Sequence, residues 1–132
     1  MIGLDTNILL RLVLQDHPEE SPKARQLIES LDADQPGFVN SLVLAEFVWT
    51  LRSRIGLTRE QTLQAVAGLL NSADILFEQE ELVEHVLDAA ASTKGDFADL
   101  MIAIKNEAAG CSKTISFDKA AVKHIPSMQL LA

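Results

Sequence analysis

The sequence has a single cysteine, Cys111, among its 132 residues. One cysteine cannot form an intramolecular disulfide, and it cannot supply the several thiolates of a cysteine-based zinc site. A reducing cytoplasm is therefore the expected location of the protein. Cys111 follows a glycine and has no thiol partner, so it is expected to lie buried as a small apolar side chain.

Long hydrophobic runs are also missing. The longest run, Ile8 to Leu14, is interrupted by Arg11 and is much shorter than the ~18 residues of a membrane-spanning segment. The first residues, MIGLDTN, lack the basic and apolar regions of a signal peptide. The sequence thus predicts a soluble protein with no membrane association.

Basic residues are few, because 11 Lys and Arg stand against 19 Asp and Glu, for a formal net charge of −8. This balance disfavours a large electrostatic surface for nucleic acid, unless the acids gather around divalent cations, whose charge the count leaves out. Aromatic residues are also few, with five Phe, one Trp and no Tyr, and hydrophobic residues make up 48%. A single globular domain over residues 1–132 is expected, with a mainly aliphatic core.

Short apolar runs alternate with helical patterns along the chain. Strands are expected over 1–5, 38–40, 75–77, 114–117 and 128–131, and helices over 6–14, 22–31, 41–55, 58–71, 80–92 and 96–109. Ser21 and Ser41 are expected to cap the second and third helices, Thr58 and Gln61 to form a capping box, and Gly56 to end a helix. The alternation predicts an α/β fold in which helices cover a mainly parallel sheet, with a ligand site at the carboxyl ends of the strands.

Acidic residues stand at positions where the local pattern does not require them for solubility: Asp5, Glu46, the pair Asp96 and Asp99, and Asp118. Asp5 and Asp118 end apolar strands, where each could equally cap the next helix. Asp96 and Asp99 lie at a helix start, where the helix dipole favours carboxylates in any case. Glu46 has apolar neighbours on both sides, so it is expected to point into a polar site, with a solvent-exposed helix edge as the alternative.

Parallel strands bring strand ends and helix starts to one edge, where three or four of these acids could meet. Their negative charges would repel one another, and the motifs supply no fixed Lys or Arg as a counter-ion. Such a cluster therefore requires divalent cations. Oxygen ligands without His or Cys favour Mg²⁺ or Mn²⁺ over zinc or copper. Such ions commonly support phosphoryl chemistry.

Four strings of the sequence resemble the PIN-domain ribonucleases, and among these the VapC toxins of prokaryotic toxin–antitoxin pairs. They are LDTNILLR at 4–11, SLVLAEFVWTLR at 41–52, DFADLMIA at 96–103 and ISFDKAA at 115–121. The resemblance extends from Met1 to about Leu131. It implies a three-layer α/β/α sandwich and an endoribonuclease that depends on Mg²⁺ or Mn²⁺. It also implies a homodimer that a small antitoxin protein inhibits.

The resemblance assigns roles to individual residues. It implies that the catalytic and metal-binding acids are Asp5, Glu46, Asp99 and Asp118, with Asp96 as an auxiliary ligand and Asn7 and Ser116 as polar neighbours of the first and last acids. Ser116 stands where the family often has Thr, and the hydroxyl is kept. In the implied reaction the ions activate water for attack on phosphorus, which leaves 5′-phosphate and 3′-hydroxyl ends.

RNA and antitoxin contacts have weaker signals. Basic residues near the motifs are candidates for RNA phosphate contacts, with solvated charge as the alternative: Arg11, Arg52, Arg54 and Lys119. Helices 41–55 and 58–71 carry more apolar positions than one core face requires, and some could line an antitoxin groove: Trp49, Leu51, Ile55, Leu57, Leu63, Val66 and Leu69. The histidines lie outside the motifs, so histidine acid–base catalysis is not expected.

The alternatives to a ribonuclease are a receiver domain, a phosphatase and a non-catalytic adaptor. A phosphotransfer receiver domain needs an adjacent acid pair near the N-terminus, but Asp5 stands alone there. A phosphatase of the haloacid dehalogenase type needs a second Asp two residues after the first, and that position is Asn7. A non-catalytic adaptor with the same fold, binding RNA or protein, is the remaining alternative. The complete set of acids argues against it.

Overall fold

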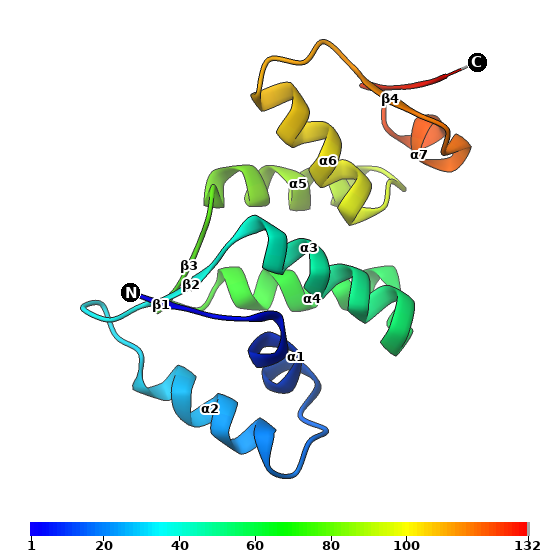
Figure 1. The fold of residues 1–132 in the computed structure, drawn as a ribbon. Coiled ribbons are helices and arrows are strands. Elements are labelled where there is room, and N and C mark those ends of the chain that lie inside the picture. The colour runs from blue at the N-terminus through cyan, green and yellow to red at the C-terminus, as the bar shows by residue number, and fades with distance from the viewer. Residues whose placement is uncertain (132) are drawn as a thin grey trace. The chain divides into compact units, whose positions relative to one another are not determined.

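The structure is a computed structural model that describes residues 1–131. Contacts along the backbone divide the chain into two compact units, Met1–Glu80 and a second that begins at Glu81. Each unit combines helices with parallel strands (Figure 1). Every strand pair formed by residues 1–131 is parallel, so the predicted α/β class with parallel pairing is confirmed. Within the same residues, no helix combines the length and the apolar character needed to span a membrane.

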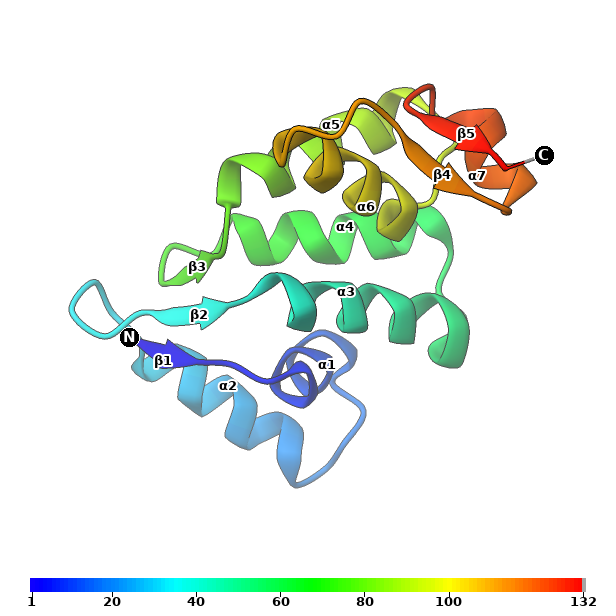
Figure 2. The same cartoon turned by 45° about the horizontal axis from the view of Figure 1, so that its top comes forward.

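The N-terminal unit is built on a three-stranded sheet in the order β1-β2-β3, which Figure 2 shows side by side. Its elements in chain order are β1 (Ile2–Gly3), α1 (Thr6–Leu14), α2 (Glu20–Ser30), β2 (Gly37–Val39), α3 (Ser41–Thr50), the π-helical turn η1 (Leu51–Ile55), α4 (Arg59–Leu70) and β3 (Ile75–Phe77). Helix α1 packs against α2 and α3, and α4 packs against β3 and η1. These contacts enclose an aliphatic core around Leu9, Val39, Leu44, Phe47 and Val66.

The C-terminal unit holds two long helices, a pair of strands and a short helix. Its elements are α5 (Glu80–Ser92), α6 (Phe97–Ala108), β4 (Thr114–Ser116), α7 (Lys119–His124) and β5 (Met128–Leu130). Strands β4 and β5 pair with Ile115 opposite Gln129, and α7, which connects them, packs against both. Val83, Val86, Phe97 and Met101 are buried in this unit. The predicted strands and helices are therefore present, with shifts of a few residues at their ends.

Two of the predicted helix caps are wrong. Ser21 does not cap α2; it is buried, and its hydroxyl donates to the Arg11 carbonyl oxygen at 2.9 Å. The ring of His17 provides the acceptor at the start of α2 instead, because its Nδ1 accepts from the backbone N–H of Glu20 at 2.9 Å. Ser41 does not cap α3 either, because Asn40 precedes it in extended conformation and accepts from the N–H of Val43 at 2.8 Å.

Other predicted end signals are confirmed. Thr58 and Gln61 form the expected capping box at the start of α4, with bonds in both directions. Gly56 ends η1 with φ of 84°, a left-handed conformation that glycine adopts easily. The prediction of a buried Cys111 is wrong, because this residue is exposed. It lies in the connection between α6 and β4, after the helix and its apolar face have ended.

Candidate active site

Asp5 follows the first strand by two residues and caps the first helix. One carboxylate oxygen of Asp5 accepts from the N–H of Thr6 at 2.8 Å, and the side chain is exposed. A carboxylate has about four acceptor sites on two oxygens, so capping leaves capacity for a ligand. The Thr6 hydroxyl is buried, and the described residues offer it no hydrogen-bond partner.

The carboxyl edge of the N-terminal sheet gathers further polar groups. Strands β1 and β2 are adjacent and parallel, so Asp5 after β1 and Asn40 after β2 lie at the same edge. Glu78 follows β3 at this edge, and its Oε1 accepts from the N–H of Ser41 at 2.8 Å. Sequence reasoning missed Glu78. Its position immediately after the apolar run Ile75–Phe77 was the available signal, the same one that singled out Asp5.

Glu46 lies on the outer face of α3. The buried face of this helix carries Leu44, Phe47 and Val48, whereas Glu46 is exposed. Leu42, one turn before it, is 77% exposed. The carboxylate thus avoids the apolar core, as expected from the cost of burying an unpaired charge. Its role as a site residue stays a prediction.

The C-terminal unit contains three of the predicted acids, and two of them act electrostatically on the third. Asp96 caps α6, where its Oδ2 accepts from the N–H groups of Ala98 and Asp99 at 3.1 and 3.4 Å. Asp118 caps α7 through Oδ1, which accepts from two backbone N–H groups at 3.0 Å each. Burial, together with the negative charges of Asp96 and Asp118, raises the pKa of the half-buried Asp99 carboxyl above its ordinary value. Asp96 and Asp118 therefore act on Asp99 electrostatically, and each of them also caps the start of a helix.

These carboxylates fit a hard divalent cation in their chemistry. They are oxygen donors, and a bound cation would offset both the burial and the neighbouring charges that raise the pKa of Asp99. No three His, Cys, Asp or Glu side chains within residues 1–131 are grouped closely enough to hold a metal ion. The ligand set drawn from the sequence therefore stays a prediction.

The two polar neighbours of the acids differ in their surroundings. Ser116 is half-buried at the end of β4, and its Oγ accepts from the N–H of Asp118 at 2.9 Å. This bond fixes the backbone that carries the last acid. Asn7 is exposed near the start of α1, where it lines a hollow of about 320 Å³ shared with Arg11 and residues of α2.

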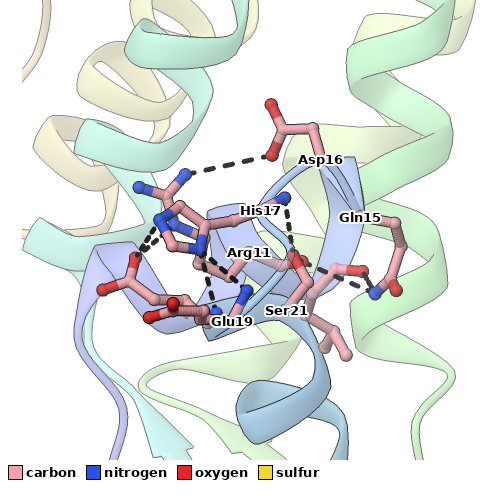
Figure 3. A network of polar contacts seen from close by, with 8 residues as sticks. Arg11, Gln15, Asp16, His17, Glu19 and Ser21 are labelled. Carbon is pink, nitrogen blue, oxygen red and sulfur yellow. Dashed lines mark hydrogen bonds and ion pairs between the residues drawn. The ribbon is translucent and has the colours of Figure 1, made fainter.

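Arg11 is engaged by acids of its own unit. Its Nε donates to Glu20 Oε1 at 2.6 Å, and its Nη1 lies 3.9 Å from Asp16 Oδ1, in the network of Figure 3. The hydrogen bond from Arg11 holds the pKa of the Glu20 carboxyl below its ordinary value. An RNA phosphate would have to compete with Glu20 for this guanidinium.

The other basic candidates are exposed. Arg52 donates from Nη1 to the Leu57 carbonyl oxygen at 2.8 Å, which ties it to the turn after η1. Arg54 borders a second hollow next to α1, and Lys119 is the first residue of α7, directly after Asp118. Contacts of these residues with RNA stay predictions.

The apolar residues considered for an antitoxin groove divide by burial. Leu51, Val66 and Leu69 are buried in the core, so they are unavailable to a partner. Trp49 and Ile55 are 56% and 46% exposed. The surface part of this set is therefore Trp49 and Ile55, with Leu57 and Leu63 half-buried.

Comparison with known proteins identifies a family and a similar solved structure. The chain matches the family model of the PIN domain over residues 2–126. Among curated proteins no match is found. A crystal structure of Mycobacterium tuberculosis VapC20, described as a toxin that cleaves the sarcin–ricin loop, is similar at 18% sequence identity with a TM-score of 0.47. That likeness covers 95% of this chain and 97% of the VapC20 chain.

Proposed function

Because the chain belongs to the PIN domain family, we propose that it is an endoribonuclease that depends on Mg²⁺ or Mn²⁺ and acts as the toxin of a toxin–antitoxin pair. The observation that carries this proposal is a family match over residues 2–126 that includes every acid implicated from the sequence. A cytoplasmic location agrees with this function. The metal, the RNA substrate and the antitoxin are parts of the proposal.

We assign the chemistry to four acids, Asp5, Glu46, Asp99 and Asp118, with Asp96 as an auxiliary ligand. When bound, a divalent cation would lower the pKa of a water molecule and offset negative charge at the reacting phosphate. The raised pKa of Asp99 supports this assignment, because burial and the charges of Asp96 and Asp118 make its ionised form costly without a cation. Asp96 and Asp118 accept hydrogen bonds from backbone N–H groups. These bonds hold the two carboxylates at defined helix starts.

The reaction proposed is hydrolysis of an RNA phosphodiester. The water oxygen bonds to phosphorus, the bond from phosphorus to the 3′ oxygen breaks, and that oxygen takes up a proton. The products carry a 5′-phosphate and a 3′-hydroxyl. Ser116 keeps Asp118 in place through its Oγ, so we assign it a positioning role.

The test is cleavage of a mixed RNA pool by four amide variants: Asp5→Asn, Glu46→Gln, Asp99→Asn and Asp118→Asn. Loss of a ligand for the catalytic ion should lower cleavage by at least about 100-fold in each variant, since metal-dependent hydrolysis needs the complete site. Rates are read from the appearance of new RNA ends by sequencing. Circular dichroism checks that each variant is folded.

Matched controls separate the site from a general loss of charge. Asp88→Asn on α5 and Glu60→Gln on α4 remove exposed acids outside the motifs, and both should cleave like wild type. Equal activity in the site variants and the controls would contradict the assignment. Folded wild-type protein that binds RNA but never cuts it would favour the non-catalytic adaptor.

We also propose a homodimer and an antitoxin that covers Trp49 and Ile55. These two apolar side chains are exposed on consecutive helical segments, α3 and η1, which suits the groove-binding of an amphipathic helix. Trp49→Ala should weaken binding of the co-expressed antitoxin, measured by calorimetry, whereas Asp88→Asn should not. Unchanged antitoxin affinity in Trp49→Ala would exclude this surface, and light scattering tests the dimer.

A further inference from the structure

Phe117 is the most exposed aromatic side chain among residues 1–131. It is 76% exposed, whereas Phe47, Phe77 and Phe97 are buried in the two cores. Single exposed apolar residues are common on protein surfaces and need no explanation by themselves. The position of Phe117 is more specific, because it immediately precedes Asp118, one of the proposed catalytic acids.

The backbone on both sides of Phe117 is fixed by hydrogen bonds. The Ser116 carbonyl oxygen accepts from the N–H of Leu131 at 3.0 Å, and the Ser116 Oγ accepts from the N–H of Asp118 at 2.9 Å. On the other side, Asp118 Oδ1 holds the N–H groups of Ala120 and Ala121. The exposed ring is thus carried by an anchored turn between β4 and α7. Such a ring loses little additional freedom when a flat partner packs on it.

The segment around Phe117 is basic in an otherwise acidic chain. Residues 111–131 contain three lysines, Lys113, Lys119 and Lys123, and a single acid, Asp118, although the whole chain has a net charge of −8. All three lysines are exposed. Lys119 and Lys123 are one turn apart on α7 and share a face of the helix. Clustered lysines complement a phosphate backbone, whereas a purely apolar protein partner has no need of them.

We propose that Phe117 is a base-stacking residue, whose ring packs on the face of an RNA base while Lys113, Lys119 and Lys123 contact the flanking phosphates. Aromatic rings combined with cationic side chains are the general means of holding single-stranded nucleic acid. This proposal rests on the proposed ribonuclease function and deepens it, because stacking beside Asp118 would select an unpaired nucleotide next to the site of cleavage. Phe117 is therefore a positioning residue rather than a catalytic one.

The test is binding of a 5′-fluorescein-labelled 12-nucleotide oligoadenylate to the full chain, measured by fluorescence anisotropy in EDTA at low salt. Phe117→Ala should bind about 5- to 150-fold more weakly than wild type, the effect typical of losing one stacked base. Ile115→Ala is the matched control, because Ile115 is 47% exposed on β4, two residues before Phe117, but cannot stack. Its affinity should equal that of wild type.

Two further variants distinguish stacking from apolar bulk. Phe117→Trp should restore binding, and Phe117→Leu, which keeps an apolar side chain of similar size, should not. An oligoadenylate with one abasic nucleoside at the stacked position should bind to wild type more weakly than the intact oligoadenylate does. Phe117→Ala should bind the two oligonucleotides equally. With Mg²⁺ and cleavable RNA, Phe117→Ala should raise KM and leave kcat close to wild type.

The outcomes separate this proposal from the function on which it rests. If wild type cleaves RNA and Phe117→Leu or Phe117→Ala binds and cleaves as well as wild type, stacking is overturned and the ribonuclease stands. If Phe117→Ala loses self-association or antitoxin binding but keeps RNA affinity, Phe117 is a protein contact and the proposal is overturned. If folded wild type neither binds nor cleaves RNA, both proposals are overturned.

Discussion

The ionisation of Asp99 is the clearest electrostatic feature of an individual residue. Burial and the charges of Asp96 and Asp118 raise its pKa above the ordinary value of 3.8. An acid with a raised pKa in the folded state stabilises that state fully below its unfolded pKa, and this contribution is lost as pH rises through the folded pKa. In the absence of metal, ionised Asp99 therefore lowers the stability of the protein at neutral pH.

Asp99→Asn should consequently unfold at an equal or higher urea concentration than wild type at pH 7 in EDTA. The gain should not exceed about 1 kcal/mol, because Asp99 is only half-buried and solvent screens these charges. It should shrink as pH falls below the ordinary value of 3.8. Urea denaturation at pH 7 and near pH 3.5 measures both. A clear loss of stability at pH 7 would mean that ionised Asp99 has a favourable partner in the folded protein.

Side-chain environments were the least predictable feature at the scale of single residues. Cys111 is exposed although its apolar character suggested burial, because it lies in a turn outside the packed face of α6. Arg11 was a candidate for RNA, yet Glu20 engages its guanidinium at 2.6 Å. Both outcomes depend on which segments meet in space, and neighbours along the sequence do not encode that information.

Helices and strands were predictable from periodicity and end signals, whereas the identity of some caps was not. Asn40 and Ser41 are adjacent and both suit a cap, and the choice follows from where the extended backbone of β2 ends. At the start of α2, the ring of His17 accepts hydrogen bonds from the N–H groups of Glu19 and Glu20, a role that no short sequence motif predicts. The capping box of Thr58 and Gln61 was predictable because all its groups lie within four consecutive residues.

Two glycines provide a matched prediction at the scale of helical elements. Gly56 ends η1 with φ of 84°, and Gly68 lies inside α4 with an ordinary helical backbone. At neither residue would an added Cβ meet another atom within 4 Å. Any difference between them therefore reports backbone conformation alone.

Gly56→Ala should destabilise the protein by about 1 kcal/mol, because alanine is strained in the left-handed region. Gly68→Ala should stabilise it by about 0.5–1 kcal/mol, since alanine favours helix and restricts the unfolded chain. Urea denaturation of the two variants and wild type compares them directly. Shifts of the same sign in both variants would contradict this account of how η1 ends.

For the whole molecule, the fold class was predictable because motifs along nearly the entire chain supported one reading. The family match over residues 2–126 confirms a PIN-type, three-layer α/β/α class, and the strand pairs confirm parallel pairing. Asp96 and Asp118 were predictable as helix caps because each directly precedes a helical pattern, and they cap α6 and α7. Glu78 and Phe117 were missed, since their significance depends on a sheet edge and on exposure.

The central claim is metal-dependent hydrolysis of RNA, and the most direct measurement is cleavage of a mixed RNA pool by folded, antitoxin-free wild type. The account predicts no cleavage in EDTA and restored cleavage when Mg²⁺ or Mn²⁺ is added in excess. It also predicts that the new downstream fragments carry 5′-phosphates, detected by their direct ligation to an adaptor. Cleavage that persists in EDTA, or fragments with 5′-hydroxyl ends, would contradict it.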